Sequence, residues 1–291
     1  MLRVFGLRAV FVLLITAGTL YSTRYTTLKA AFMRVDWLCF LLGAMVAERR
    51  GRSGLAGALV ALAGLSRVFP FVFAFGPAVT LLRGLVVFGS LDRRALRFLL
   101  ALGGVVVLLV GASVMASSPA YWGAFFNKIG HHQDDITGMR IGFLYLLAGA
   151  WDGRAWGGVS IASFYAEHAW LQPVVRVGAL LGAAGLALRL RAPWERLVIG
   201  FFLLFFLTSL TYYYYVVLLV PALWLASRLR DGRAAALLCL SLLGSAVTHF
   251  VCDRLDRGYA SSFSQTVAVL VLILGASWLM VRAPQPDGRR A

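Results

Sequence analysis

The stretch KAAFMRVDWLCFLLGAMVAERRGRSGLAGALVALAGLSRVFP, residues 29–70, contains the pattern that decides the fold. Two apolar runs, 29–47 and 54–66, flank a short turn with three arginines. Each run is continuous rather than alternating, which indicates a helix and disfavours a barrel strand. Arg67 and Pro70 then interrupt the apolar pattern. Because proline lacks an amide hydrogen and disfavours helix at the residue before it, we expect two short or broken helices to meet there.

Similar apolar runs recur along the whole chain. Of its 291 residues, 60% are hydrophobic and only 14% are charged, whereas a soluble domain has about 25% charged residues. Such a chain has too little polar surface to cover a water-exposed globule. We therefore predict an all-α fold, a polytopic integral membrane helical bundle of about ten hydrophobic helices that forms a single membrane domain over residues 1–291. The runs are 8–22, 29–47, 54–66, 68–82, 98–115, 171–188, 197–211, 213–227, 234–250 and 265–281.

Basic residues alternate between the loops as expected for a multi-pass membrane protein. With the N-terminus on the cytoplasmic side, 18 Arg and Lys residues fall in inside segments and 7 in outside segments, in agreement with the positive-inside rule. Both termini are then cytoplasmic, including the tail 283–291, and one long loop, about 116–170, lies outside. This distribution accounts for the net charge of +16 without a nucleic-acid partner, and membrane lipids are the expected partners.

The long outer loop holds the densest polar cluster, FFNKIGHHQDDITGMRIG at residues 125–142. The flanking segment SPAYWGAFFNKI, which includes Trp122, is typical of an interfacial helix, and GMRIGFLYLLAGAW favours a second, half-buried helix. His131 and Asp134 are candidates for a general base or for a group near a diphosphate; alternatively, the cluster is a plain polar loop at the interface. The adjacent histidines lack zinc-ligand spacing, so no metal site is assigned, while Asp134 and Asp135 leave a divalent cation as an open alternative.

Charged residues also fall near the ends of apolar runs, where charge is costly and usually paired or functional. Arg34 and Asp36 are two positions apart and point to different faces of a helix. They are either polar anchors at the interface, or Arg34 faces an anionic substrate. Arg67, at the helix break, requires a phosphate, a carboxylate or exposed carbonyls. The alternatives are that it reaches the membrane interface or pairs with Asp36.

The run TYYYYVVLLVP at residues 211–221 places Tyr212, Tyr213 and Tyr214 at the outer end of two helices. These tyrosines form either an aromatic belt at the interface or a stacking wall for a sugar ring. The sequence has no nucleotide-binding loop and no serine hydrolase motif. Any energy source must therefore arrive with the substrate, and on the outer face a lipid-linked activated donor is the natural candidate.

Three stretches resemble the polyprenyl-phosphate-dependent GT-C glycosyltransferases, in particular the family 87 mannosyltransferase-like group of bacterial membrane proteins. They are FMRVDWLCFLLGAMVAERRGRSGLAGALVALAGLSRVFPFVFAFGP, YWGAFFNKIGHHQDDITGMRIGFLYLL and LTYYYYVVLLVPAL, which together span roughly residues 30–225. The resemblance implies a multi-pass protein of the bacterial inner (cytoplasmic) membrane. It would transfer a mannose-like sugar from a polyprenyl-phosphate donor to an acceptor glycan or lipid on the non-cytoplasmic face, with no cofactor.

The resemblance also assigns roles by position. Arg67, with Arg34 and Lys128, would bind the donor phosphate, and His131 would match a histidine of the outer loop. Trp122 and the tyrosines would contact the sugar or the lipid. The family's catalytic acid lies in the first outer loop, which here has no Asp or Glu. We therefore expect an N-terminally truncated chain whose missing helices would carry that acid. Asp36 lies too late to match it but could substitute for it, and His131 and Asp134 are further catalytic candidates.

Two other readings remain. A catalytically inactive fragment or accessory membrane subunit would keep the packing motifs without an outer acid in the first loop, as this sequence does. A lipid or solute transporter would show repeat symmetry between its halves and charges that face a central cavity. The sequence shows neither of these transporter features.

Overall fold

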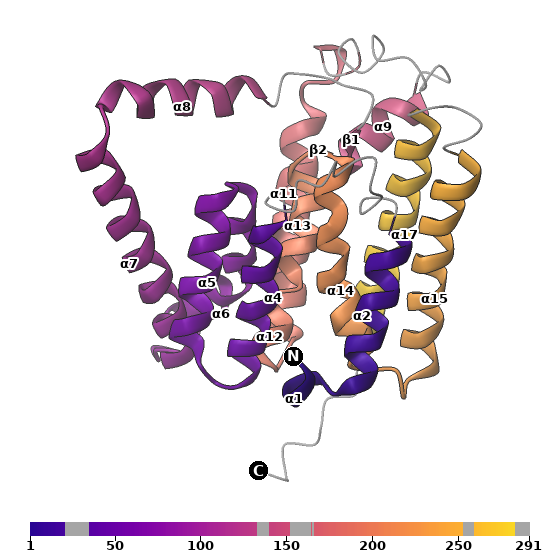
Figure 1. Ribbon diagram of the computed structural model, residues 1–291, viewed down its shortest axis with the longest axis horizontal. Coiled ribbons are helices and arrows are strands. Elements are labelled where there is room, and N and C mark those ends of the chain that lie inside the picture. Colours follow the sequence, from indigo (N-terminus) through magenta and orange to yellow (C-terminus); the bar gives the residue numbers. More distant parts are fainter. Residues whose placement is uncertain (21–34, 133–139, 152–163, 165, 253–258, 283–291) are drawn as a thin grey trace.

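The computed structural model describes residues 1–20, 35–132, 140–151, 164, 166–252 and 259–282. These residues form helices almost throughout (Figure 1). The helices of the first half are α1 (Leu2–Phe5), α2 (Leu7–Thr19), α4 (Asp36–Arg49), α5 (Ser53–Ser66), the 3-10 helix η3 (Phe69–Ala74), α6 (Phe75–Phe88), α7 (Arg93–Ala116) and α8 (Pro119–His132).

The second half contains more helices and one very short antiparallel strand pair, β1 with β2. Its elements are β1 (Arg140–Ile141), α9 (Phe143–Trp151), α11 (Leu171–Arg189), α12 (Pro193–Arg196), α13 (Ile199–Leu207), β2 (Leu210–Thr211), the 3-10 helix η4 (Tyr212–Leu218), α14 (Leu219–Ala226), α15 (Gly232–Val247), the π-helix η5 (Thr248–Cys252) and α17 (Tyr259–Arg282).

Within the described residues each predicted apolar run overlaps a helical segment, which confirms the all-α class. Within the described ranges, five helices are long and apolar enough to cross a membrane. The number of about ten spans therefore remains a prediction, because the other runs form shorter helices. The five are Phe69–Phe88, Arg93–Ala116, Leu171–Arg189, Gly232–Val251 and Ser261–Arg282.

The predicted break between two short helices is confirmed. Helix α5 ends at Ser66, and η3 begins at Phe69, just before Pro70. Between them Arg67 adopts an extended conformation, with φ −150° and ψ 124°. The proline at the start of η3 needs no amide hydrogen there, since the first turn of a helix leaves its amides unpaired.

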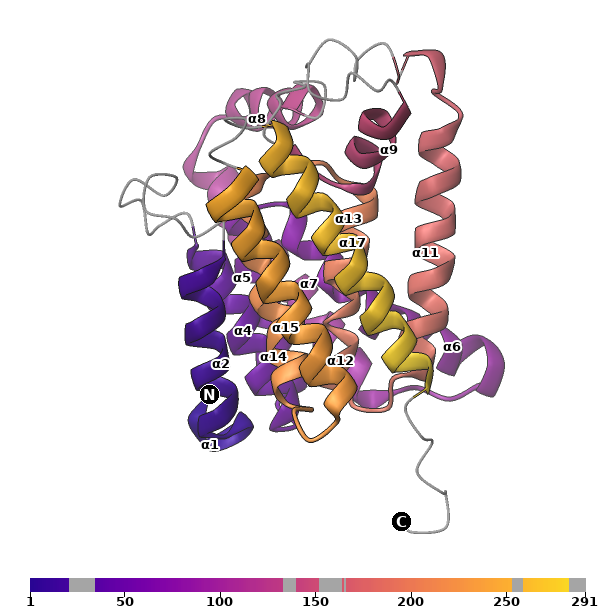
Figure 2. The same ribbon diagram turned by 90° about the vertical axis from the view of Figure 1, so that its right-hand side faces the viewer.

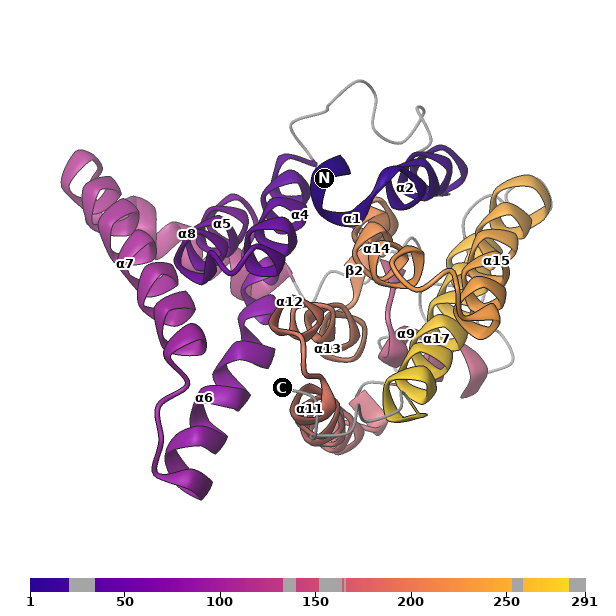
Figure 3. The same cartoon turned by 90° about the horizontal axis from the view of Figure 1, so that it is seen from below.

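The core is formed by α4, α13 and α14, together with η4. Helix α13 has the sequence IGFFLLFFL and is buried over most of its length, as expected for a helix that is apolar on every side. The largest fully buried side chains include Trp37, Tyr215 and Trp224. Seen along the bundle, α13 and α14 lie between α4 and α5 on one side and α15 and α17 on the other (Figure 3).

The bundle has two distinct ends. The arginine end, defined by Arg49, Arg196 and Arg228, is held together by ion pairs: Arg196 lies 3.6 Å from Asp92, and Arg228 lies 2.6 Å from Glu195. These contacts join α12 to the start of α7 and to the end of α14. The opposite end carries β1, β2 and α9 (Figures 1 and 2).

Helix α8 lies across the bundle. It runs transversely to α7, beyond the level at which α5 ends (Figure 1). Its aromatic and apolar residues Tyr121, Phe125 and Phe126 are exposed. This placement agrees with the expected interfacial helix, whose exposed aromatic rings would lie at headgroup level.

Candidate functional site

Three aromatic rings from separate parts of the chain meet at the end of the bundle opposite the arginine end. The ring centroids of Trp37 and Phe69 are 4.8 Å apart, and those of Phe69 and Tyr214 are 5.1 Å apart. Trp37 and Tyr214 are 6.5 Å apart. This group, called the aromatic cluster below, joins the start of α4, the start of η3 and η4. Edge-to-face contacts of this kind stabilise such clusters beyond the burial of their area.

Arg67 follows the end of α5, two residues before Phe69 of the aromatic cluster. Its Nε is buried and forms no hydrogen bond with the described residues. Its Nη1 donates a long hydrogen bond of 3.4 Å to the carbonyl of Ser66. In the described part of the chain no carboxylate lies within 4.0 Å of Arg67, so the alternative ion pair with Asp36 is not formed there. A guanidinium in this state is a ready partner for an anion.

Asp36 begins α4, next to Trp37 of the aromatic cluster. It is half-buried, and its Oδ1 accepts a hydrogen bond of 2.8 Å from the amide of Trp37. A carboxylate at a helix start is stabilised by the unpaired amides and by the helix dipole. Asp36 therefore shares one end of the bundle with Arg67, and its position there has a structural reason of its own.

The tyrosines reach this end because of the β1–β2 pair. Ile141 pairs with Leu210 and Arg140 with Thr211, directly before the tyrosine run. The buried hydroxyl of Tyr215 donates a hydrogen bond of 3.1 Å to the carbonyl of Ile141. The tyrosines before Tyr215 form a row of rings. The ring centroids of Tyr213 and Tyr214 are 4.4 Å apart, and those of Tyr212 and Tyr213 are 6.0 Å apart. The short strand before α9 is thus tied to the tyrosine run.

Other predicted site residues lie elsewhere or outside the described residues. Trp122 contacts Phe125 and Phe126 of its own helix α8, at 5.6 and 5.9 Å. Lys128 is exposed on the same helix. The structure does not bring these two residues into the aromatic cluster. His131 belongs to α8, but its side chain is not described. Arg34 and Asp134 lie outside the described residues.

Sequence reasoning missed two polar features near the same end. Arg140 of β1 is only 8% exposed. The first turns of α17 bury Ser261 and Gln265, and neither the Ser261 hydroxyl nor the Gln265 carbonyl oxygen has a hydrogen-bond partner among the described residues. The sequence feature that could have indicated this polar group is SSFSQT at residues 261–266, which overlaps the start of the predicted apolar run 265–281. Buried polar groups at membrane depth often mark a functional site.

The arginine end also has a buried polar residue, in the last turn of α4. Glu48 is 6% exposed, and its Oε1 accepts a hydrogen bond of 2.9 Å from the Ser53 hydroxyl. Its Oε2 has no partner among the described residues. Burial raises the pKa of Glu48 above its ordinary value of 4.5, and the Ser53 hydrogen bond, Arg94 and Arg196 oppose this rise.

The described residues contain no group of three or more His, Cys, Asp or Glu side chains that could hold a metal ion. The two aspartates that left a divalent cation open, Asp134 and Asp135, are not among those residues. Comparisons of this chain with models of protein families, with curated proteins and with solved structures find no match.

Proposed function

We propose that this protein is a membrane glycosyltransferase that transfers a mannose-like sugar from a polyprenyl-phosphate donor on the non-cytoplasmic face. In this proposal the arginine end faces the cytoplasm, because cytoplasmic loops carry the excess of basic residues. The aromatic cluster then lies toward the outer leaflet. The membrane is the inner membrane of a bacterium, and the acceptor is a glycan or a lipid.

The observation that carries the proposal is the state of Arg67. Its Nε is buried without a hydrogen bond from the described residues, and Arg67 precedes Phe69 of the aromatic cluster by two residues. An unpaired guanidinium at membrane depth is costly. A lipid phosphate would remove that cost through charge-assisted hydrogen bonds, and the half-buried rings of Phe69 and Tyr214 would offer stacking surface to the sugar that the phosphate carries.

The chemistry requires three groups. The acceptor hydroxyl oxygen attacks the anomeric carbon of the donor sugar, and the bond between that carbon and the phosphate oxygen breaks. The phosphate leaves with its negative charge, which Arg67 stabilises. The proton of the acceptor hydroxyl passes to a base. In this proposal Asp36 is that base, since its carboxylate lies beside Trp37 at the same end of the bundle.

A second candidate is an accessory subunit that binds a lipid phosphate without transferring the sugar. The hydrogen bond between Asp36 and the amide of Trp37 favours it, because a carboxylate that already accepts a backbone hydrogen bond in the first turn of a helix has a structural role there. This candidate predicts that the protein binds the donor and shows no turnover.

The test is a transfer assay with the protein in proteoliposomes and radiolabelled polyprenyl-phosphate mannose. Arg67→Gln is compared with Arg52→Gln, since Arg52 is an exposed arginine in the turn at the other end of α5. We expect Arg67→Gln to lower kcat by about 100-fold or more and Arg52→Gln to leave it unchanged. Equal rates for both variants would remove Arg67 from the site. Donor binding without transfer by the unaltered protein would favour the accessory subunit.

A further inference from the structure

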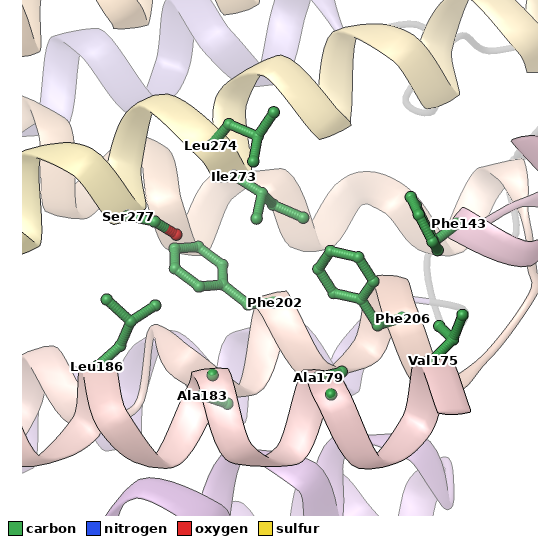
Figure 4. Close-up of a pocket in the computed structure, with 12 residues that line it drawn as sticks. Phe143, Val175, Ala179, Ala183, Leu186, Phe202, Phe206, Ile273, Leu274 and Ser277 are labelled. Atoms are coloured by element: carbon green, nitrogen blue, oxygen red, sulfur yellow. The ribbon is translucent and has the colours of Figure 1, made fainter. Parts of the chain in front are cut away.

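An apolar groove runs along the outside of the bundle, between α11 and α17 (Figure 4). Its volume is about 310 Å³. Phe202 and Phe206 of α13 project into it, and Phe143 of α9 lies at one end (Figure 4). Among the lining residues, Ser277 supplies the one side-chain hydroxyl, and the rest of the lining is apolar.

The groove opens to the surroundings of the bundle. Both flanking helices are long and apolar enough to cross a membrane. On α11, the lining residues Gly178 and Gly182 are exposed, and a Cβ added at either would meet no atom within 4 Å. On α17, Leu274 is 59% exposed. In a bilayer, the medium that enters this opening is lipid hydrocarbon.

The dimensions of the groove decide what fits in it. Its lining on α11 extends from Val175 to Leu186, a length of about 16 Å at 1.5 Å per residue. This long, apolar shape suits a single extended hydrocarbon chain.

The length points to a phospholipid chain rather than a longer carrier lipid. One leaflet provides about 15 Å of hydrocarbon, half of a core of about 30 Å. An acyl chain of ordinary length therefore matches the groove from end to end. A polyprenyl chain is branched by a methyl group in each unit and is several times longer, so it would leave most of its length outside.

A positive charge lies near the same end of the groove as Phe143. Arg176 follows the lining residue Val175 on α11 and is exposed. Its Nη2 makes a long hydrogen bond of 3.4 Å to the amide oxygen of Gln172. Within the described ranges no carboxylate lies within 4.0 Å of it. A negatively charged headgroup above the groove would complement this charge.

We propose that the groove between α11, α13 and α17 binds one acyl chain of an anionic phospholipid, whose headgroup pairs with Arg176. The site is separate from Arg67 and the aromatic cluster, and it does not depend on the proposed sugar transfer. The lipid fills a surface that would otherwise lack packing contacts, and it stabilises the contact of α11 with α17.

Native mass spectrometry of the purified protein tests this proposal, with phosphatidylglycerol and phosphatidylcholine of identical chains as probes. The unaltered protein should retain one phosphatidylglycerol and prefer it to phosphatidylcholine about fivefold, as expected for one arginine near a headgroup. Gly182→Leu fills the groove and should weaken binding about tenfold or more, because it displaces two or three methylene groups.

Gly185→Leu is the matched control. It makes the same change on the same helix, outside the lining, and its Cβ also meets no atom within 4 Å. It should leave binding unchanged. Arg176→Gln should abolish the preference for phosphatidylglycerol while the chain still binds, which gives a readout that does not depend on filling the groove.

Several results would overturn the proposal. Equal lipid binding by Gly182→Leu and Gly185→Leu is one such result. A full preference for phosphatidylglycerol in Arg176→Gln is another. Displacement of phosphatidylglycerol by an equimolar polyprenyl phosphate would assign the groove to the carrier lipid. A dimer that is lost only in Gly182→Leu would assign it to a second copy of the chain.

Discussion

Substitution of Gly57 by alanine tests the packing that supports the site. Gly57 lies on α5, the helix that ends beside Arg67. A Cβ at this position would clash with the carbonyl oxygen of Phe98 on α7 and would lie 2.8 Å from its carbonyl carbon. Ordinary contacts begin near 3.4 Å. The two helices would therefore have to separate by at least 0.6 Å, the difference between these two distances.

The cost of this separation can be bounded. A gap of about 0.5–1 Å forfeits a quarter to a half of the attraction between facing atoms, and overpacking costs about 1–3 kcal/mol. Gly54→Ala is the matched control, because it lies on the same helix and its Cβ would meet only Ala101 Cβ, at 4.0 Å. Both substitutions replace glycine by alanine on the same helix, which removes most of the helix-propensity difference from the comparison.

Thermal unfolding in detergent, at one fixed scan rate, measures the difference. We expect the apparent midpoint of Gly57→Ala to lie about 3–10 °C below that of Gly54→Ala. Indistinguishable midpoints would refute the argument that close backbone approach, permitted by a small residue, holds α5 against α7. A loss of sugar transfer in Gly57→Ala at an unchanged midpoint would instead indicate that the end of α5 moves without unfolding.

Two further predictions concern the ends of the bundle. Tyr215→Phe removes the hydrogen bond to the Ile141 carbonyl and should lower the free energy of unfolding by about 1–3 kcal/mol, and proteolysis should cut more readily near β1. If the midpoint and the proteolysis rate both stay at the unaltered values, that bond does not tie the loop down. Burial raises the pKa of Glu48 in the folded state, so its contribution to stability is present below about pH 4.5 and is lost as pH rises through the folded pKa. At neutral pH the buried carboxylate is therefore unfavourable, and Glu48→Gln, which removes the charge, should raise the apparent unfolding midpoint. A Gln variant with the pH dependence of the unaltered protein would contradict this assignment.

Much of the helical architecture follows from local sequence. The break after Ser66 was predicted because Arg67 and Pro70 interrupt an apolar run, and the chain breaks there. The transverse helix α8 was predicted because its aromatic residues suit an interface. Both features depend on residues within a few positions of one another, so no long-range contact is needed to infer them.

The site was only partly accessible to such reasoning. The sequence singled out Asp36, Arg67 and Tyr214 separately, as charges or rings at the ends of apolar runs. It did not show that Trp37, Phe69 and Tyr214 touch, because that contact joins three distant segments. Arg140 was passed over for the same reason: its burial depends on the pairing of β1 with β2.

The sequence by itself determined the helical class of this protein and indicated a membrane as its medium. Continuous apolar runs and clustered arginines are incompatible with a water-exposed globule, and they require helices whose backbone hydrogen bonds close locally. Only the tertiary structure decided which side chains meet and which are buried: the contact of Trp37 with Phe69, the buried oxygen of Gln265, and the groove that α11 and α17 leave over Phe202 and Phe206. Helices of nearly uniform apolar composition present no strongly preferred face, so their rotation and partners are set by packing between distant residues.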